Sequence, residues 1–203
     1  MSHTLATIQQ IFLYPVKSMR GVAVNTAHLS LNGFIGDRRY AFVQRELAAT
    51  DGFPWLTGRD KPKMILYAPR FIRAPTAEDW DAPIVVQTPE GQELEIEDSR
   101  FFLFKTKRGN YDSQHVSLFS LASLRDLESE SASAIDPRQF RANLYIEPVG
   151  DPFVEDEWVG RVLQIGAHAR VGVTKKDTRC MMINLDPDSA KQNPAVLRTV
   201  TRY

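Results

Sequence analysis

The sequence predicts a mainly β fold with a few helices, and two observations support this. Short runs rich in β-branched and aromatic residues recur along the chain, separated by Gly, Pro, Asn and Asp. Apolar residues at helical spacing occur in the second half, where a few helices are therefore expected. The 203 residues suffice for one large domain or for two small domains that share a core.

The first half of the chain is typical of strands joined by turns. We expect strands over residues 6–14, 23–31, 40–45, 62–67, 84–88, 93–96 and 101–106. The segment Pro89-Glu90-Gly91-Gln92 predicts a hairpin turn, because glycine accepts a positive φ angle.

The second half mixes helices and strands. A helix is expected over residues 120–129, where Ser120 is suited to the N-cap and leucines follow at three-residue spacing. Further along we expect a strand over 143–147, a hairpin formed by 161–165 and 168–174, and a helix over 194–203 that begins with a proline. A change of pattern near residues 107–113 predicts two domains, over 1–106 and 107–203.

Charge and hydropathy exclude several classes of partner. The chain has 25 basic and 25 acidic side chains, so binding of nucleic acid by counterion release is not expected. The N-terminus lacks the order of a secretory signal, and no apolar run reaches the roughly 18 to 20 residues that span a bilayer. We therefore expect a soluble protein that does not bind membranes.

The single cysteine, Cys180, restricts the chemistry further. One cysteine forms no internal disulfide and no Cys-Cys zinc clamp, which favours a reducing compartment, by default the cytoplasm. Cys180 follows Arg179 directly and stands near Lys175 and Lys176, and such cations favour the thiolate, which is a nucleophile and a soft metal ligand. The apolar run that begins at Cys180 is equally compatible with an inert core residue.

Two further segments place cations at the ends of predicted strands. Lys17 and Ser18 follow the first strand, where an ammonium and a hydroxyl group could bind an anion, or could simply lie in a solvated turn. In the segment Gly36-Asp37-Arg38-Arg39-Tyr40 one guanidinium could bind a phosphate, although a surface ion pair with Asp37 is an alternative.

A third segment, Phe140 to Leu144, carries Arg141 and Asn143. Alternation along a strand would place both on one face, where they could recognise a polar ligand, with a rim salt bridge as the alternative. One thiol and several cations, without a carboxylate pair or a histidine base, suit an anionic cofactor with a soft metal better than they suit hydrolysis.

Six motifs together resemble one known family. The chain is similar to MOSC domain proteins (molybdenum cofactor sulfurase C-terminal) that carry an N-terminal β-barrel domain, especially to the amidoxime-reducing components and their bacterial counterparts. The motifs occur in the order YPVKSMRG, GDRRYAFV, LTGR, FRANLYI, FVEDEWVGRVLQIG and TRCMMINLDPDS. The resemblance implies an N-terminal β-barrel-like domain packed on a MOSC β-barrel.

The resemblance also implies a cofactor and the residues that hold it. Cys180 corresponds to the thiolate that ligates molybdenum, beside the dithiolene of a molybdenum-pterin cofactor. The positions that would hold the pterin and its phosphate are Lys17, Ser18, Arg38, Arg141, Asn143, Thr178 and Arg179, with Asp112 and Ser113 on a further loop. Members of the family reduce small N-hydroxylated compounds with electrons from a separate redox protein, and an association with pyridoxal phosphate is also attached to the family.

The chain departs from the family pattern in two places. Ser189-Ala190 stands where relatives usually have Thr-Gly, so the conformational freedom of the glycine is lost. Relatives also continue beyond Tyr203 with a Phe-Gly motif and a closing strand, so we expect the barrel to be shortened, closed differently or completed by a partner. Two other functions therefore stay open, a sulfur carrier with a persulfide on Cys180 and a binding module without catalysis.

Overall fold

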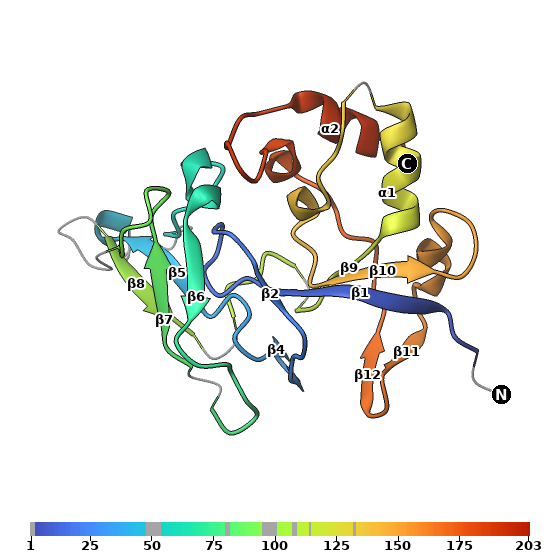
Figure 1. Ribbon diagram of the computed structural model, residues 1–203, viewed down its shortest axis with the longest axis horizontal. Coiled ribbons are helices and arrows are strands. Elements are labelled where there is room, and N and C mark those ends of the chain that lie inside the picture. The colour runs from blue at the N-terminus through green and yellow to red at the C-terminus, as the bar shows by residue number, and fades with distance from the viewer. Residues whose placement is uncertain are drawn as a thin grey trace.

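The described part of the chain is mainly β, as the sequence predicts. The computed structural model describes residues 3–47, 54–79, 82–94, 101–106, 109–113, 115–131 and 133–203. These residues form twelve strands, two α-helices and five short 3₁₀ helices. In Figure 1 the strands β5 to β8 lie on one side of the molecule, and β1, β10 and both α-helices lie on the other.

A four-stranded sheet joins the two halves of the sequence. Its order is β2-β1-β10-β9, and the strands in that order span Val22–Val24, Ala6–Leu13, Leu144–Pro148 and Leu118–Ser120. β1 runs antiparallel to β10, from the pair Ala6 and Pro148 to the pair Ile11 and Leu144, with one irregularity between Ile8 and Gln10. The first strand of the chain thus pairs with a strand from the second half.

Three strand pairs build the rest of the N-terminal part. They are β5 with β8, β6 with β7, and β3 with β4, and they span Tyr40–Gln44, Phe101–Lys105, Ala68–Phe71, Ile84–Gln87, Leu29–Ser30 and Gly33–Phe34. Their core buries Val16, Phe42, Met64 and Val86. The expected turn follows β7, where the Gly91 N–H donates to the Thr88 carbonyl and Gly91 has a φ of 85°.

The structure corrects several predicted strands. Residues 62–67 form a 3₁₀ helix, η2 (Pro62–Leu66), because a proline begins the apolar run and a short apolar run has no β-specific period. The predicted strand over 23–31 is two short strands, β2 and β3. Of the strand expected over 93–96, Glu93 forms a bridge with Gln87, and residues 95–96 lie outside the described residues. β6 was not predicted because Pro69 lies inside it.

The helices and the hairpin of the C-terminal part confirm their predictions. The helices are α1 (Leu121–Glu130) and α2 (Pro194–Val200), and the hairpin pairs β11 (Val162–Ile165) with β12 (Ala169–Gly172). Four 3₁₀ helices complete the described elements, at Arg45–Leu47, Pro137–Phe140, Val154–Trp158 and Met181–Asn184. Neither α-helix in the described residues has the length and the apolar character needed to cross a membrane.

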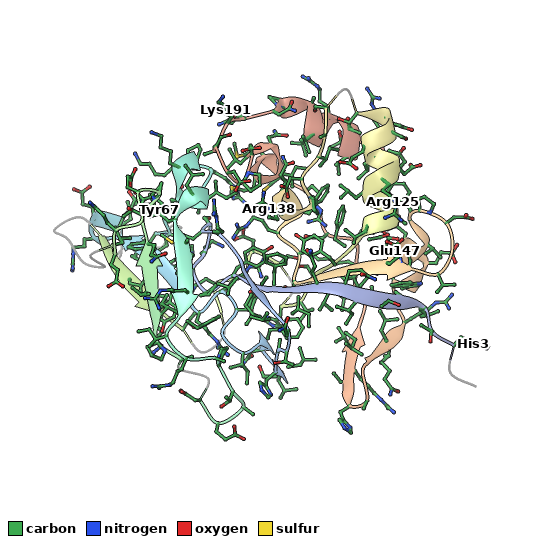
Figure 2. The ribbon with its side chains drawn as sticks, in the orientation of Figure 1. His3, Tyr67, Arg125, Arg138, Glu147 and Lys191 are labelled. Atoms are coloured by element: carbon green, nitrogen blue, oxygen red, sulfur yellow. The ribbon has the colours of Figure 1, made fainter. Side chains whose placement is uncertain are left out.

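Both α-helices pack on one apolar core. Phe119, Leu124, Leu127, Phe140 and Val196 are buried together there. On the outer side of α1 the Arg125 Nη2 donates to Glu147 Oε1 of β10 at 2.5 Å, and Figure 2 shows the two side chains next to each other. The core fixes the segments before and after Phe140, and these segments carry several of the site residues predicted from the sequence.

The N-cap of α1 provides a first test of the fold. Ser120 is fully buried, and its Oγ accepts a hydrogen bond from the Ser123 N–H at 3.2 Å. We expect Ser120→Ala to lower the free energy of unfolding by about 1 kcal/mol, because the first turn would lose its cap. Urea denaturation measures the change. Ser129→Ala at the exposed end of the same helix is the control, and equal losses in both variants would contradict the capping role.

Candidate functional site

The turn after β1 buries a lysine against the loop that follows β8. Lys17 is 7% exposed, and its Nζ donates to the Asn110 carbonyl at 3.0 Å and to Asp112 Oδ1 at 2.6 Å. Burial lowers the pKa of Lys17, and the hydrogen bond to Asp112 opposes that effect. The next residue, Ser18, has a φ of 65°, which is uncommon for a residue other than glycine.

Asp37 and Arg38 form a buried ion pair beneath this turn. Asp37 is fully buried, accepts the Tyr14 N–H at 2.6 Å and pairs with Arg38 Nη1 at 2.5 Å. Burial alone would lower the pKa of Arg38, but the charge of Asp37 raises it. The neighbouring Arg39 reaches the Thr106 carbonyl, whereas Arg38 reaches the Arg141 carbonyl in the second half of the chain.

Arg38 reaches the segment that carries Arg141 and Asn143. Its Nη2 donates to the Arg141 carbonyl at 3.1 Å, and its Nη1 lies 3.5 Å from Asn143 Oδ1. The predicted strand alternation over this segment is wrong, because Phe140 ends the 3₁₀ helix η3, Arg141 is left-handed with a φ of 53°, and β10 begins only at Leu144. The Asn143 amide bonds Ser117 and Phe12, so it serves the fold.

Arg141 is a partly buried cation held by a backbone carbonyl and an aromatic ring. Its Nη1 donates to the Met19 carbonyl at 2.7 Å, and its guanidinium lies 4.5 Å from the centre of the Tyr14 ring. Among the described residues it forms no ion pair, and burial lowers its pKa. A buried charge of this kind favours an anionic partner.

The segment with the thiol approaches the same region from the second half. Arg179 Nη1 donates to the Phe140 carbonyl at 3.2 Å and pairs with Asp177 at 2.9 Å. Cys180 is partly exposed and precedes the 3₁₀ helix η5. Its Sγ accepts from Arg59 Nη2 at 3.7 Å, and this hydrogen bond is the main cause that raises the pKa of Arg59.

Arg59 was not among the residues that the sequence predicted, although the motif LTGR contained it. It also lies 3.5 Å from Asp112, which in turn contacts Lys17. A chain of contacts therefore runs from Cys180 through Arg59 and Asp112 to Lys17. Because Arg59 and Cys180 are 121 positions apart, no local spacing in the sequence could have revealed their contact.

Contacts join most but not all of the predicted residues. Lys17, Arg38, Asp112, Arg141, Arg179 and Cys180 belong to the same region, with Ser18 in the turn between Lys17 and Met19. Thr178 and Ser113 are exposed and make no side-chain hydrogen bond within the described part of the chain. Ser18, Arg38 and Arg141 all have positive φ angles, and such strained residues cluster at functional sites.

Comparison with known proteins gives the family. The MOSC N-terminal beta barrel domain family matches residues 5–123, and the MOSC domain family matches residues 105–203. This chain is a MOSC domain protein. It is also similar to the mitochondrial amidoxime reducing component 2 of Bos taurus, with 22% identity over 238 positions that cover 91% of this chain and 68% of the bovine protein. Neither comparison supports an association with pyridoxal phosphate.

The residues of this MOSC protein fit an anionic cofactor. Five cations of the region, with four carboxylates between them, leave a surplus of one positive charge. The cations are Lys17, Arg38, Arg59, Arg141 and Arg179, and the acids are Asp37, Asp60, Asp112 and Asp177. A cavity of about 280 Å³ opens beside Arg141 and is also lined by Arg20 and Arg138. Figure 2 shows Arg138 in the middle of the molecule.

Two local features of the cavity support that fit. Arg20 lines the cavity, and its buried Nε has no hydrogen-bond partner among the described residues, so one donor of this side chain is left unsatisfied. Gly21 lets the chain pass against the Tyr14 ring, because a Cβ there would come within 2.6 Å of Tyr14 Cε1. The guanidiniums that line the cavity suit a phosphate group. The Lys17 ammonium and the Cys180 thiol are not part of the cavity lining, and of these the thiol suits a soft metal.

A second loop of the MOSC protein joins the two halves at the edge of the cavity. Asp188 accepts from Arg138 Nη2 at 2.6 Å and from Arg20 Nη2 at 3.3 Å. Asp186 holds the loop, since its Oδ1 accepts from the Ser189 hydroxyl and N–H at 2.7 Å, and these bonds lower the pKa of Asp186. Ala190 then adopts a φ of 56°.

The left-handed Ala190 leads to a test of this loop. Ala190 carries a Cβ, and the left-handed conformation costs such a residue roughly 1–2 kcal/mol. We expect Ala190→Gly to raise the free energy of unfolding by about 0.5–1 kcal/mol after the larger entropy of the unfolded glycine chain is subtracted. Urea denaturation measures the gain. Ala195→Gly in helix α2 is the control and should destabilise the protein. A lower free energy of unfolding in Ala190→Gly than in the wild-type protein would show that Ala190 is not strained.

Proposed function

We propose that this MOSC protein binds a molybdenum-pterin cofactor and reduces N-hydroxylated compounds. The observation that carries the proposal is the partly exposed Cys180 thiol at the edge of a region with surplus positive charge. MOSC domains are associated with binding of the molybdenum cofactor, and the bovine relative is named for amidoxime reduction. The domains would be residues 1–106 and 107–203.

The proposed binding roles follow from the chemistry of each side chain. Cys180 would ligate molybdenum as a thiolate, since soft sulfur ligands suit this metal site. Charge-assisted hydrogen bonds from guanidinium, ammonium and hydroxyl groups would hold the pterin and its phosphate. The residues proposed for this are Lys17, Ser18, Arg38, Arg141, Thr178 and Arg179, with Asp112 and Ser113 on the neighbouring loop and Asn143 as a support of Arg38.

The reaction would break an N–O bond. When bound, the cofactor would supply a centre that accepts oxygen and exchanges electrons. The substrate takes up two electrons and two protons, its N–O bond breaks, and the oxygen leaves as water. Arg59 would keep positive charge beside the thiolate, and its partly exposed side chain would mark the side from which a small substrate enters.

The electrons would come from a separate redox protein. The single cysteine rules out an iron–sulfur cluster held by four thiolates of this chain, and the sequence contains no second redox motif. Among the described residues there is no group of three or more His, Cys, Asp or Glu side chains suited to a metal ion. The unpaired cysteine suits a reducing compartment such as the cytoplasm.

Metal analysis and an activity measurement test this proposal together. The protein would be purified from a host that makes the molybdenum cofactor, and molybdenum and pterin would be measured per chain. We expect near-stoichiometric amounts of both, and reduction of benzamidoxime when a chemical electron donor is supplied. Purified protein without molybdenum and pterin would contradict the binding, and loaded protein without N–O reduction would contradict the activity.

A sulfur carrier is a second candidate, favoured by the partial exposure of Cys180 beside the Arg59 guanidinium. Here a thiolate stabilised by the cation would hold a persulfide. Intact mass spectrometry would then show one additional sulfur atom that a reductant removes. Its absence after exposure to a sulfur donor would leave the reductase as the better explanation, or a binding module if molybdenum is absent as well.

A further inference from the structure

Arg59, which belongs to the first half of the chain, touches the Cys180 thiol with its side chain. Its Nη2 lies 3.7 Å from Cys180 Sγ and 3.5 Å from Asp112 Oδ2, so the carboxylate orients the guanidinium toward the sulfur. The Arg59 side chain is 46% exposed, which places it at the open side of the site. None of the proposed cofactor contacts requires Arg59.

A rigid turn holds Arg59 in this place. The Thr57 hydroxyl donates to Asp60 Oδ2 at 2.8 Å and accepts the Arg59 N–H at 3.2 Å, while Thr57 itself is buried. The Asp60 and Lys61 N–H groups both donate to the Thr57 carbonyl. The turn therefore depends on the backbone of Arg59 and leaves its side chain to the contact with Cys180.

The turn is also pressed against the segment that follows the cysteine. A Cβ at Gly58 would come within 2.6 Å of Met182 Cε, so the turn lies directly against the Met182 side chain. Met182 belongs to the 3₁₀ helix η5, which begins directly after Cys180. The position of Arg59 is thus fixed with respect to the thiol by packing as well as by hydrogen bonds.

We propose that Arg59 is a positioning residue that donates a hydrogen bond to the Cys180 thiolate and weakens its electron donation to molybdenum. The inference rests on the proposed function. Hydrogen bonds to a sulfur ligand withdraw electron density from it and stabilise the reduced state of the metal. Removal of this donor should therefore make the metal harder to reduce.

The test is a reductive titration of the molybdenum-loaded protein, followed by electron paramagnetic resonance. We expect Arg59→Gln to shift the one-electron equilibrium at least tenfold toward the oxidised metal, which corresponds to about 59 mV. Arg59→Lys keeps a cationic donor and should recover part of the shift. Arg70→Gln removes an arginine that pairs with Glu93 on the same domain, and it should leave the potential unchanged.

The outcomes separate this inference from the proposed function. A wild-type protein without molybdenum would overturn both. Molybdenum in both proteins with equal potentials in wild type and Arg59→Gln would overturn the role of Arg59 alone, and so would an equal shift in Arg70→Gln. Circular dichroism and thermal unfolding should show that Arg59→Gln is folded, because the turn keeps its backbone and threonine bonds.

Discussion

Replacing Cys180 with serine should remove molybdenum from the purified protein and leave the fold intact. Cys180 is partly exposed, and the hydrogen bond from Arg59 is the side-chain contact that the substitution weakens. Loss of a residue that supports a metal ligand typically costs about 10–100-fold in affinity, so loss of the ligand itself should cost at least about 100-fold. Molybdenum content per chain measures the effect, and the proposed reductase activity should fall with it.

A matched control excludes a general disturbance of this segment. Lys175 is exposed and lies five positions before the cysteine, so Lys175→Ala should keep its molybdenum. Thermal unfolding of both variants should remain close to that of the wild-type protein. A Cys180→Ser protein with the wild-type molybdenum content would show that the thiolate is not the ligand.

Among the variants whose stability is compared, Asp37→Asn should lose the most free energy of unfolding. Asp37 is fully buried, accepts the Tyr14 N–H and neutralises Arg38. The substitution would leave the Arg38 guanidinium without its counter-charge, and breaking a buried ion pair in this way costs about 3–5 kcal/mol. Urea denaturation measures the free energy of unfolding, and cofactor loading should fall as well because Arg38 holds the Arg141 carbonyl.

An exposed ion pair gives the comparison for Asp37. Asp79 pairs with Arg73 on the surface, where such pairs contribute roughly 0–1 kcal/mol. Asp79→Asn should therefore have a small effect. If the free energies of unfolding of Asp37→Asn and Asp79→Asn differed by less than about 1 kcal/mol, the buried pair of Asp37 and Arg38 would not stabilise the fold as its geometry indicates.

Local sequence patterns predicted the elements that local interactions determine. Helix α1 was expected from the Ser120 cap and from the leucine spacing, and the β11–β12 hairpin from two strand-like runs on either side of Gly166. Residues 62–67 were wrongly expected to be a strand, because the apolar sequence Met-Ile-Leu fits a strand and a helical turn equally well. The short strand β9 was missed since its pairing partner, β10, lies more than twenty residues away.

The candidate site was predictable in its residue types but not in its geometry. The motif resemblance selected Lys17, Arg38, Arg141 and Cys180, and the contacts of the described residues bring them into one region. The left-handed conformation of Arg141 could not be predicted, because it arises where a 3₁₀ helix ends and a strand begins. Arg59 was missed because its role depends on a contact between distant parts of the chain.

The pairing of β1 with β10 determines how the halves of the chain can be separated. β1 carries the turn with Lys17 at its end, and the residues just before β10 include Arg141. A cut between residues 106 and 107 would separate β1 from β10, leave β2 as the partner of β1 in the sheet, and expose one edge of β1 and one of β10. The two halves of the chain should therefore not be exchangeable between relatives. A chimaera that takes both β1 and β10 from the same parent should fold, whereas one that takes them from different parents should not.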